Sequence, residues 1–114
     1  MEKFVRQTML YDFYGELLTK HQQQIFEAVV FNDIGYSEAA QQEGITRQGV
    51  HDLIRRCDQQ LEHYEEKLHR VERFLAIRRH VEKLSRISQE AAGRRAMLDP
   101  DQVGELAEKI MEEL

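Results

Sequence analysis

Side chains suited to reading nucleic-acid bases are concentrated in residues 46–55. Arg and Gln can each make paired hydrogen bonds to guanine and adenine edges, and a Thr at the start of a helix can hold a phosphate together with the helix amino terminus. If a helix begins at residue 47, six side chains point outward: Thr46, Arg47, Gln48, His51, Asp52 and Arg55. We interpret this set as a DNA-binding surface.

Catalytic and metal-binding patterns are missing from the sequence. The five His residues include no pair four positions apart, the spacing that places two metal ligands on one helix face. Nothing resembles a phosphate-cradling glycine loop, a nucleophile elbow or a Cys/His dyad. Cys57 is the only cysteine, so an internal disulfide is impossible and a packing role is expected. We expect a binding protein that is not an enzyme and needs no metal or cofactor.

A short helix, a tight turn and a second helix are predicted to hold the candidate surface. Ser37 is a good N-cap for a helix at about 38–43, and Gly44 supplies the left-handed residue that closes it. Thr46 then caps the next helix. Small side chains for close approach, one residue at the corner and two anchors complete the pattern: Ala39, Ala40, Ile45, Val50 and Leu53. Residues 36–56 are therefore typical of a tri-helical DNA-reading unit, whose second helix enters the major groove.

Two further helices are predicted before this unit. Residues 3–17 carry an apolar stripe with helical spacing: Leu10, Phe13, Tyr14, Leu17 and Leu18. Thr19 and Gln22 have the form of a capping box, so a second helix should begin near Lys20 and end before the breakers at 32–35. We expect four aromatic side chains to lie in the core: Tyr11, Phe13, Tyr14 and Phe26.

The helix from Arg47 has no strong breaker before Gly93, but its apolar stripe changes course. Steps of three and four alternate as in a coiled coil at five positions: Leu61, Tyr64, Leu68, Val71 and Leu75. Beyond them the stripe shifts register, which predicts a bend or short turn near 69–72. Two helices, 47–68 and 72–90, would then pair with each other or with a second chain.

The remaining residues are predicted to form a linker and a last helix. Residues 92–95 have the composition of a linker, and Asp99 looks like an N-cap followed by Pro100 in the first helical position. We therefore divide the chain into a helix-turn-helix domain at 1–68 and a C-terminal helical arm and tail at 69–114.

Charge is unevenly divided along the chain. Residues 1–66 hold six Lys/Arg against twelve Asp/Glu, residues 67–95 hold nine against three, and residues 96–114 hold one against six, for a net charge of −5. Such blocks indicate different partners, or regions that neutralise one another when the acidic tail folds back. One set of basic residues is suited to RNA phosphates or to an acidic protein surface: Arg78, Arg79, Lys83 and Arg86.

The chain resembles two known families. Residues 18–56 look like region 4 of bacterial sigma factors. More closely, residues 4–90 resemble the YlxM-like family of helix-turn-helix proteins through four blocks: DFYGELLT, SEAAQQEGITRQGVHDLI, YEEKLH and VERFL. The resemblance implies an all-α fold with a tri-helical, winged-helix-like domain, a bacterial origin and a link to the signal recognition particle pathway. The sequence departs from the family at Gly49, where Ala is usual, and at His51, where an aromatic residue is usual.

Two functions of different classes follow. The first is a regulator, expected to be a homodimer, that contacts DNA through its helix-turn-helix. The alternative is an interaction protein that modulates the RNA or GTPase of the signal recognition particle through the basic arm. No apolar run approaches the roughly 18 residues that cross a bilayer, and the amino terminus carries charges, so we expect a cytoplasmic protein without membrane insertion.

Overall fold

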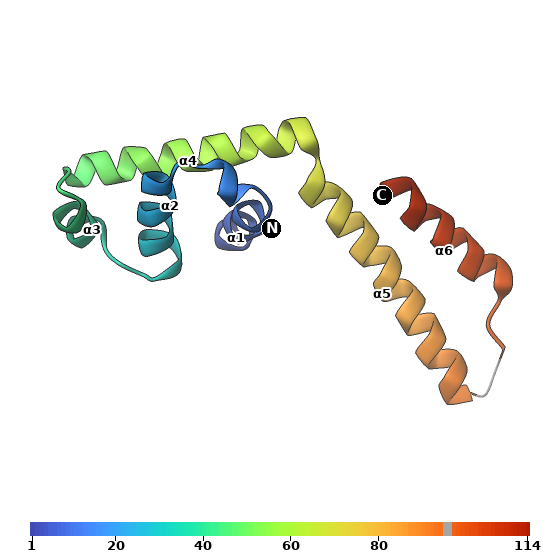
Figure 1. The fold of residues 1–114 in the computed structure, drawn as a ribbon. Coiled ribbons are helices and arrows are strands. Elements are labelled where there is room, and N and C mark those ends of the chain that lie inside the picture. Colours follow the sequence, from blue (N-terminus) through green and yellow to red (C-terminus); the bar gives the residue numbers. More distant parts are fainter. Residues whose placement is uncertain (95–96) are drawn as a thin grey trace. The chain divides into compact units, whose positions relative to one another are not determined.

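The computed structural model describes residues 1–94 and 97–114, and every regular element within these ranges is helical. The described chain contains six α-helices and two short turns of other helical types, so the predicted all-α class is confirmed. It divides into two compact units, Met1–His69 and Arg70–Leu114 (Figure 1). No helix among the described residues is long and apolar enough to cross a membrane.

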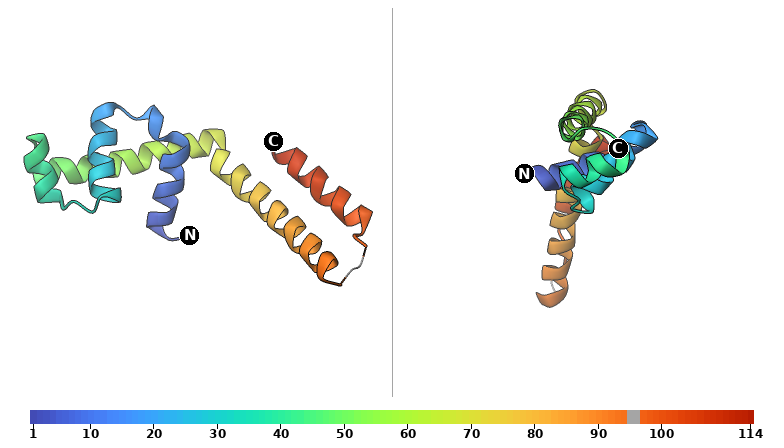
Figure 2. Two further views of the ribbon diagram at one scale, coloured as in Figure 1. Left: turned by 60° about the horizontal axis from the view of Figure 1, so that its bottom comes forward. Right: turned by 90° about the vertical axis from the view of Figure 1, so that its left-hand side faces the viewer.

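The first unit is built around one long helix. Its elements follow in the order α1 (Lys3–Tyr14), the 3-10 turn η1 (Gly15–Leu17), α2 (Lys20–Phe26), the π turn η2 (Glu27–Phe31), α3 (Tyr36–Glu43) and α4 (Arg47–Leu68). Helices α1, α2 and α3 each pack against α4 (Figure 2). Since α4 contacts all three, its apolar face determines where the others can lie.

That face of α4 carries buried side chains at steps of four, three and four residues, which places them on one stripe: Val50, Ile54, Cys57 and Leu61. Leu10 of α1 and the neighbouring Ile25 and Phe26 of α2 are buried on helices that pack against it. Burial raises the pKa of the Cys57 thiol to about 11. The thiol is therefore protonated at neutral pH and fills space in the core, as predicted.

The predicted core aromatics divide into two groups. Tyr14 and Phe26 are fully enclosed, whereas Phe13 and Tyr11 are partly exposed, with the Tyr11 ring stacked on Phe26 at a centroid distance of 5.0 Å. The prediction for Leu17 is wrong, because its side chain is 54% exposed. Leu17 lies in η1, whose tighter 3-10 winding turns it away from the apolar stripe of α1.

The predicted helix start is confirmed for α2 and is wrong for α3. The Thr19 hydroxyl accepts the Gln22 backbone N–H at 3.2 Å, and the Gln22 side chain accepts the Thr19 N–H at 2.9 Å, so the capping box is confirmed. Ser37 is not an N-cap. The N-cap of α3 is Gly35, which makes no side-chain bond, and the helix already includes Tyr36.

The second unit is a hairpin of two helices. α5 (Arg70–Arg94) and α6 (Pro100–Glu113) pack against each other and run in opposite directions (Figure 1). The Asp99 carboxylate accepts the Asp101 backbone N–H at 3.0 Å, which confirms the predicted N-cap with Pro100 after it. The basic α5 therefore has the acidic α6 as its neighbour, as the fold-back alternative required.

Two predictions about the chain after α4 need correction. His69 ends α4 in the left-handed conformation, with φ of 55°, so the predicted turn is confirmed, but the stripe from Leu61 to Leu75 is split between two helices. It cannot serve as one continuous coiled-coil seam. The linker at 92–95 is also wrong in part, because α5 continues through Arg94, while residue 95 lies outside the described residues.

A buried polar contact joins the end of α1 to the second half of α4. The Tyr14 hydroxyl donates to Glu65 Oε1 at 2.6 Å, and these residues are 2% and 8% exposed. A buried carboxylate that loses a donor is left poorly solvated, and the cost exceeds the net value of an ordinary exposed hydrogen bond.

Tyr14→Phe is expected to lower the free energy of unfolding by about 2 kcal/mol, since it removes the buried hydroxyl that donates to Glu65 Oε1. Urea denaturation followed by circular dichroism would measure the change. Tyr64→Phe is the matched control, because the Tyr64 hydroxyl accepts from Gln60 at 2.8 Å at a partly exposed site. Equal losses for both variants would contradict the special cost of the buried pair.

Candidate nucleic-acid interface

A tight turn links α3 to α4. Gly44 adopts the left-handed conformation with φ of 69°, and its backbone N–H donates to the Ala40 carbonyl. The Ile45 N–H donates to the same carbonyl at 3.1 Å. Ala39 and Ala40 are buried in α3, which packs against α4. The helix-turn-helix geometry predicted for residues 36–56 is therefore present.

Thr46 begins α4 as predicted. Its hydroxyl accepts the Gly49 backbone N–H at 2.9 Å, which satisfies one of the free N–H groups of the first turn. A Cβ added to Gly49 would lie 3.1 Å from the Thr46 Oγ1, closer than most such contacts. Gly at 49 forgoes the helix propensity of Ala, about 1 kcal/mol, but leaves the cap uncrowded.

The six predicted contact residues lie at the start of α4, and five of them are exposed. Thr46, Arg47, Gln48, His51 and Arg55 belong to this exposed group, whereas Asp52 is partly covered. Arg47 makes no ion pair within the described part of the chain, so its guanidinium is available to a ligand. The structure thus places most of the predicted set on one accessible surface.

Asp52, predicted as a DNA contact, makes two contacts with side chains of its own helix. Its Oδ1 accepts a hydrogen bond from the Gln48 Nε2 at 3.1 Å and lies 3.8 Å from an Arg55 guanidinium nitrogen. The carboxylate therefore partly neutralises Arg55 and holds the Gln48 amide. The i, i+4 and i, i+3 spacings on a helix could have suggested both contacts.

His51 is held by a residue that the sequence analysis did not assign to the site. The Tyr36 and His51 rings meet edge to face, with centroids 5.6 Å apart and an interplanar angle of 85°. Tyr36 opens α3, two residues earlier than the predicted helix, which is why its contact with α4 was missed.

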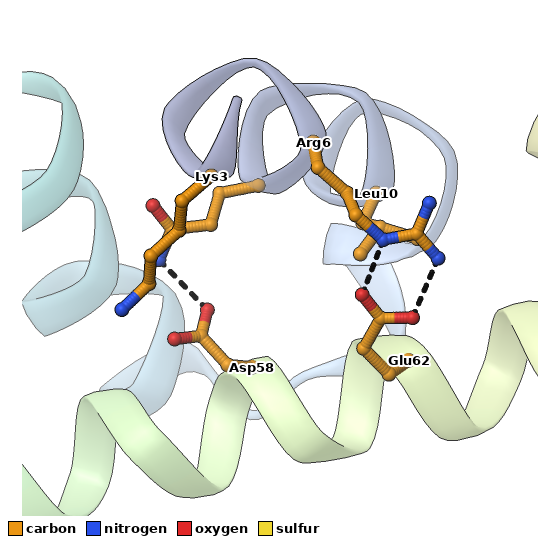
Figure 3. A pocket seen from close by; sticks show the side chains of 6 residues that line it. Lys3, Arg6, Leu10, Asp58 and Glu62 are labelled. Atoms are coloured by element: carbon orange, nitrogen blue, oxygen red, sulfur yellow. Dashed lines mark hydrogen bonds and ion pairs between the residues drawn. The ribbon is translucent and has the colours of Figure 1, made fainter. Parts of the chain in front are cut away.

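In the described part of the chain two hollows border α4, and neither belongs to the predicted contact surface as a whole. One, of about 360 Å³, is lined by Gln22, Ile45, Gly49, Asp52, Leu53 and Arg56. The other lies between α1 and α4 and is lined by Lys3, Arg6, Gln7, Leu10, Asp58 and Glu62 (Figure 3). In the described residues no group of three His, Cys, Asp or Glu side chains is arranged to hold a metal ion.

Polar contacts between α1 and α4 border this hollow. Arg6 of α1 reaches Glu62 of α4 (Figure 3). The Arg6 Nη2 donates to Glu62 Oε2 at 2.7 Å, and Gln7 donates to Asp58 at 2.9 Å. The hydrogen bond from Arg6 lowers the pKa of Glu62, so the pair stabilises the fold above the unfolded pKa of Glu62 and less as the pH falls. Because both side chains are 40% or more exposed, we assign these contacts a modest structural role.

The tight turn and the accessible start of α4 define a helix-turn-helix protein. Comparison with known proteins assigns it more closely. Residues 1–98 match the family described as "UPF0122: Putative helix-turn-helix protein, YlxM / p13 like". Because the match covers most of the chain, the protein belongs to this family.

Individual relatives agree with the family match. A UPF0122 protein of Caldanaerobacter subterraneus subsp. tengcongensis is 42% identical over 83 residues, which cover 73% of this chain and 71% of that protein. Those of Desulforamulus reducens and Acetivibrio thermocellus are 43% and 44% identical over 74 and 75 residues. These alignments cover 65% and 66% of this chain, and 63% and 64% of the relatives.

Thr46→Ala is expected to destabilise the first unit by about 1 kcal/mol, because the Gly49 N–H loses its acceptor at the start of α4. Thermal denaturation followed by circular dichroism measures the loss. Thr46→Ser keeps the hydroxyl and serves as the control. A Ser variant as unstable as the Ala variant would show that the methyl group, and not the cap, matters at this position.

Proposed function

We propose that this protein is a DNA-binding regulator that reads base edges with the first turns of α4. The observation that carries the proposal is the exposed row of Arg47, Gln48, His51 and Arg55, which the α3-turn-α4 geometry presents on one side of a helix. In helix-turn-helix proteins the corresponding part of the second helix enters the major groove. Arg supplies the side chain that most often contacts guanine there.

The net charge of the helix-turn-helix determines how strongly it is expected to bind DNA. Residues 36–56 contain three arginines and three acidic residues, so their charges sum to zero: Arg47, Arg55, Arg56, Glu38, Glu43 and Asp52. Sequence-independent affinity comes from neutralised phosphates, so a surface without net charge should bind random DNA weakly and with a small salt dependence.

Dimerisation belongs to the proposal because two copies of α4 would contact two half-sites and double the interactions. The predicted interface from Leu61 to Leu75 does not form one helix surface, so we do not assign the dimer to it. A pseudo-palindromic selected sequence, with half-sites one helical turn apart or a multiple of it, would support two-fold binding.

Arg47→Ala should lower affinity for a sequence selected from random DNA by about 10- to 100-fold, because a bidentate Arg contact to guanine contributes on the order of 1–3 kcal/mol of discrimination. Fluorescence anisotropy on the selected and scrambled duplexes measures the effect. The helical circular-dichroism signal should stay unchanged, since Arg47 is exposed.

Arg56→Ala is the matched control. Arg56 lies nine residues beyond Arg47, about two and a half turns of helix, so it is on the opposite side of α4 but carries the same charge. It should change binding to both duplexes equally or not at all. If Arg47→Ala leaves the selected sequence bound with full preference, α4 is not the reader.

The basic surface of α5 supports a second candidate function, binding to the RNA or GTPase of the signal recognition particle. Arg78, Arg79, Lys83 and Arg86 are all exposed. Arg78 is held by Glu82 at 3.0 Å, but the other three make no ion pair with any described residue. Accessible, unneutralised cations attract phosphates or an acidic protein surface.

Reversing Arg78, Arg79 and Lys83 to Glu should abolish recovery of this RNA or GTPase in a pull-down from cell extract, because attraction becomes repulsion. Arg47→Ala should leave the same recovery intact. Recovery that is indifferent to the three reversals would exclude α5 as the binding surface.

A further inference from the structure

We infer that the hairpin of α5 and α6 dimerises with a second copy of itself through one uncharged face, so that α5 of each protomer packs against α6 of its partner. The inference goes beyond the proposed function, because it holds whether or not the protein binds DNA. It also assigns the dimer surface that the stripe from Leu61 to Leu75 cannot provide. The observation behind it is the way in which apolar, small and charged side chains are divided around the two helices.

The two helices of the hairpin pack along an inner stripe on each of them. The stripe advances by alternating steps of three and four residues, and all eight of its members are partly or fully buried: His80, Leu84, Ile87, Ala91, Val103, Leu106, Ile110 and Glu113. Such a stripe covers only one side of a helix. A hairpin of two helices therefore leaves the other sides of both helices to solvent or to a partner.

The positions that directly follow the inner stripe form the uncharged face. Each lies about 100° further round its helix. Because α5 and α6 run in opposite directions (Figure 1), this step turns both sets to the same side of the hairpin. All eight are exposed, and none is charged: Val81, Ser85, Ser88, Ala92, Gly104, Ala107, Met111 and Leu114. Val81, Met111 and Leu114 are 47%, 69% and 80% exposed, so a partner that covered them would remove apolar surface from water.

The opposite side of the hairpin is a charged face. Its eight positions directly precede the inner stripe, all are exposed, and seven are charged: Arg79, Lys83, Arg86, Glu90, Gln102, Glu105, Lys109 and Glu112. Lys109 pairs there with Glu105 at 3.4 Å. Removing such a face from water would bury many charges, whereas the uncharged face carries no such cost. Arg79, Lys83 and Arg86 would stay accessible in the dimer, so it is compatible with the second candidate function of α5.

Small side chains on the uncharged face allow a second hairpin to approach closely. Five of its eight members are Gly, Ala or Ser, and nothing lies within 4 Å of a Cβ added to Gly104. Packed helices lie about 8–10 Å apart, and the shorter separations require small residues at the contact. Two such hairpins placed face to face make a four-helix bundle, in which the larger Val81 and Met111 side chains fill the core.

The charges of the two helices favour a second copy as the partner and determine how it lies. α5 has seven Lys/Arg and three Asp/Glu, and α6 has one and five, so their net charges are +4 and −4. Two-fold symmetry allows the uncharged faces to meet with α5 against the partner's α5, or with α5 against the partner's α6. The first arrangement places like charges together. The second places opposite charges together at every contact between helices, and is therefore the favoured one.

Sedimentation equilibrium of the full chain tests for this dimer. The wild type should dimerise with a Kd in the micromolar range, because the face is smaller than most stable interfaces. Met111→Glu should weaken dimerisation by about tenfold or more, since it places an unpaired charge in the interface. Gln102→Glu is the matched control, because it adds the same charge to the same helix at an exposed position of the charged face. It should leave the Kd unchanged, and circular dichroism checks that both variants are folded.

Disulfide cross-linking tests which helices meet. Ser88 lies six residues before Arg94 at the end of α5, and Ala107 lies seven residues after Pro100 at the start of α6, so both are at a similar distance from the turn of the hairpin. Ser88→Cys and Ala107→Cys are purified separately, mixed and oxidised. The mixture should form a covalent heterodimer in preference to either homodimer. Cys57 is fully buried and should not take part.

Three results would overturn the inference. One is a wild-type chain that stays monomeric at about 200 µM. Another is a dimer that Met111→Glu and Gln102→Glu leave equally intact. The third is cross-linking in which Ser88→Cys joins to itself more readily than to Ala107→Cys. Failure of the proposed DNA-binding function is a separate result, since it is seen when the chain selects no DNA sequence, whether or not the dimer forms.

Discussion

The burial of one stripe of α4 is the constraint on which the first unit depends. Val50, Ile54, Cys57 and Leu61 are each 6% exposed or less, and α1, α2 and α3 all pack against the helix that carries them. A helix of 22 residues is about 33 Å long at 1.5 Å per residue, so three short helices can be arranged along it. The same helix presents its opposite side at the amino-terminal end to solvent. The core and the candidate reading surface are therefore two faces of one element, and substitutions on the buried stripe would displace both.

Most of the fold could be predicted because its signals are local. The capping residues Thr19, Thr46 and Asp99 act within one helical turn, and the left-handed Gly44 and the helix break at His69 follow from the pattern around them. The prediction that Leu17 joins the apolar stripe was wrong because this residue lies in a 3-10 turn, whose winding differs from that of an α-helix although its composition does not. The linker prediction was wrong in part because α5 continues through Gly93. A glycine inside a helix carries only a modest cost in stability. Gly93 also lies in open space, since nothing lies within 4 Å of the position of an added Cβ.

The candidate site was predictable as a set of positions but not as a set of interactions. Helical periodicity places Arg47, Gln48, His51 and Arg55 on one side of α4, and the structure shows them exposed. Periodicity does not choose between solvent and a neighbour for each polar group, so the contacts of Asp52 with Gln48 and of Tyr36 with His51 became visible only in three dimensions. These contacts change which polar groups the surface offers to a ligand, but they do not change which residues form it.

The buried thiol of Cys57 allows local opening of the first unit to be measured by thiol labelling. The side chain is 0% exposed and sits in the middle of the α4 stripe, and its raised pKa keeps the reactive thiolate scarce even when a reagent is near. A thiol reagent can reach it only after α1, α2 or α3 separates from α4. Because no other cysteine is present in the chain, the labelling rate reports how often the core opens at Cys57, without an engineered probe.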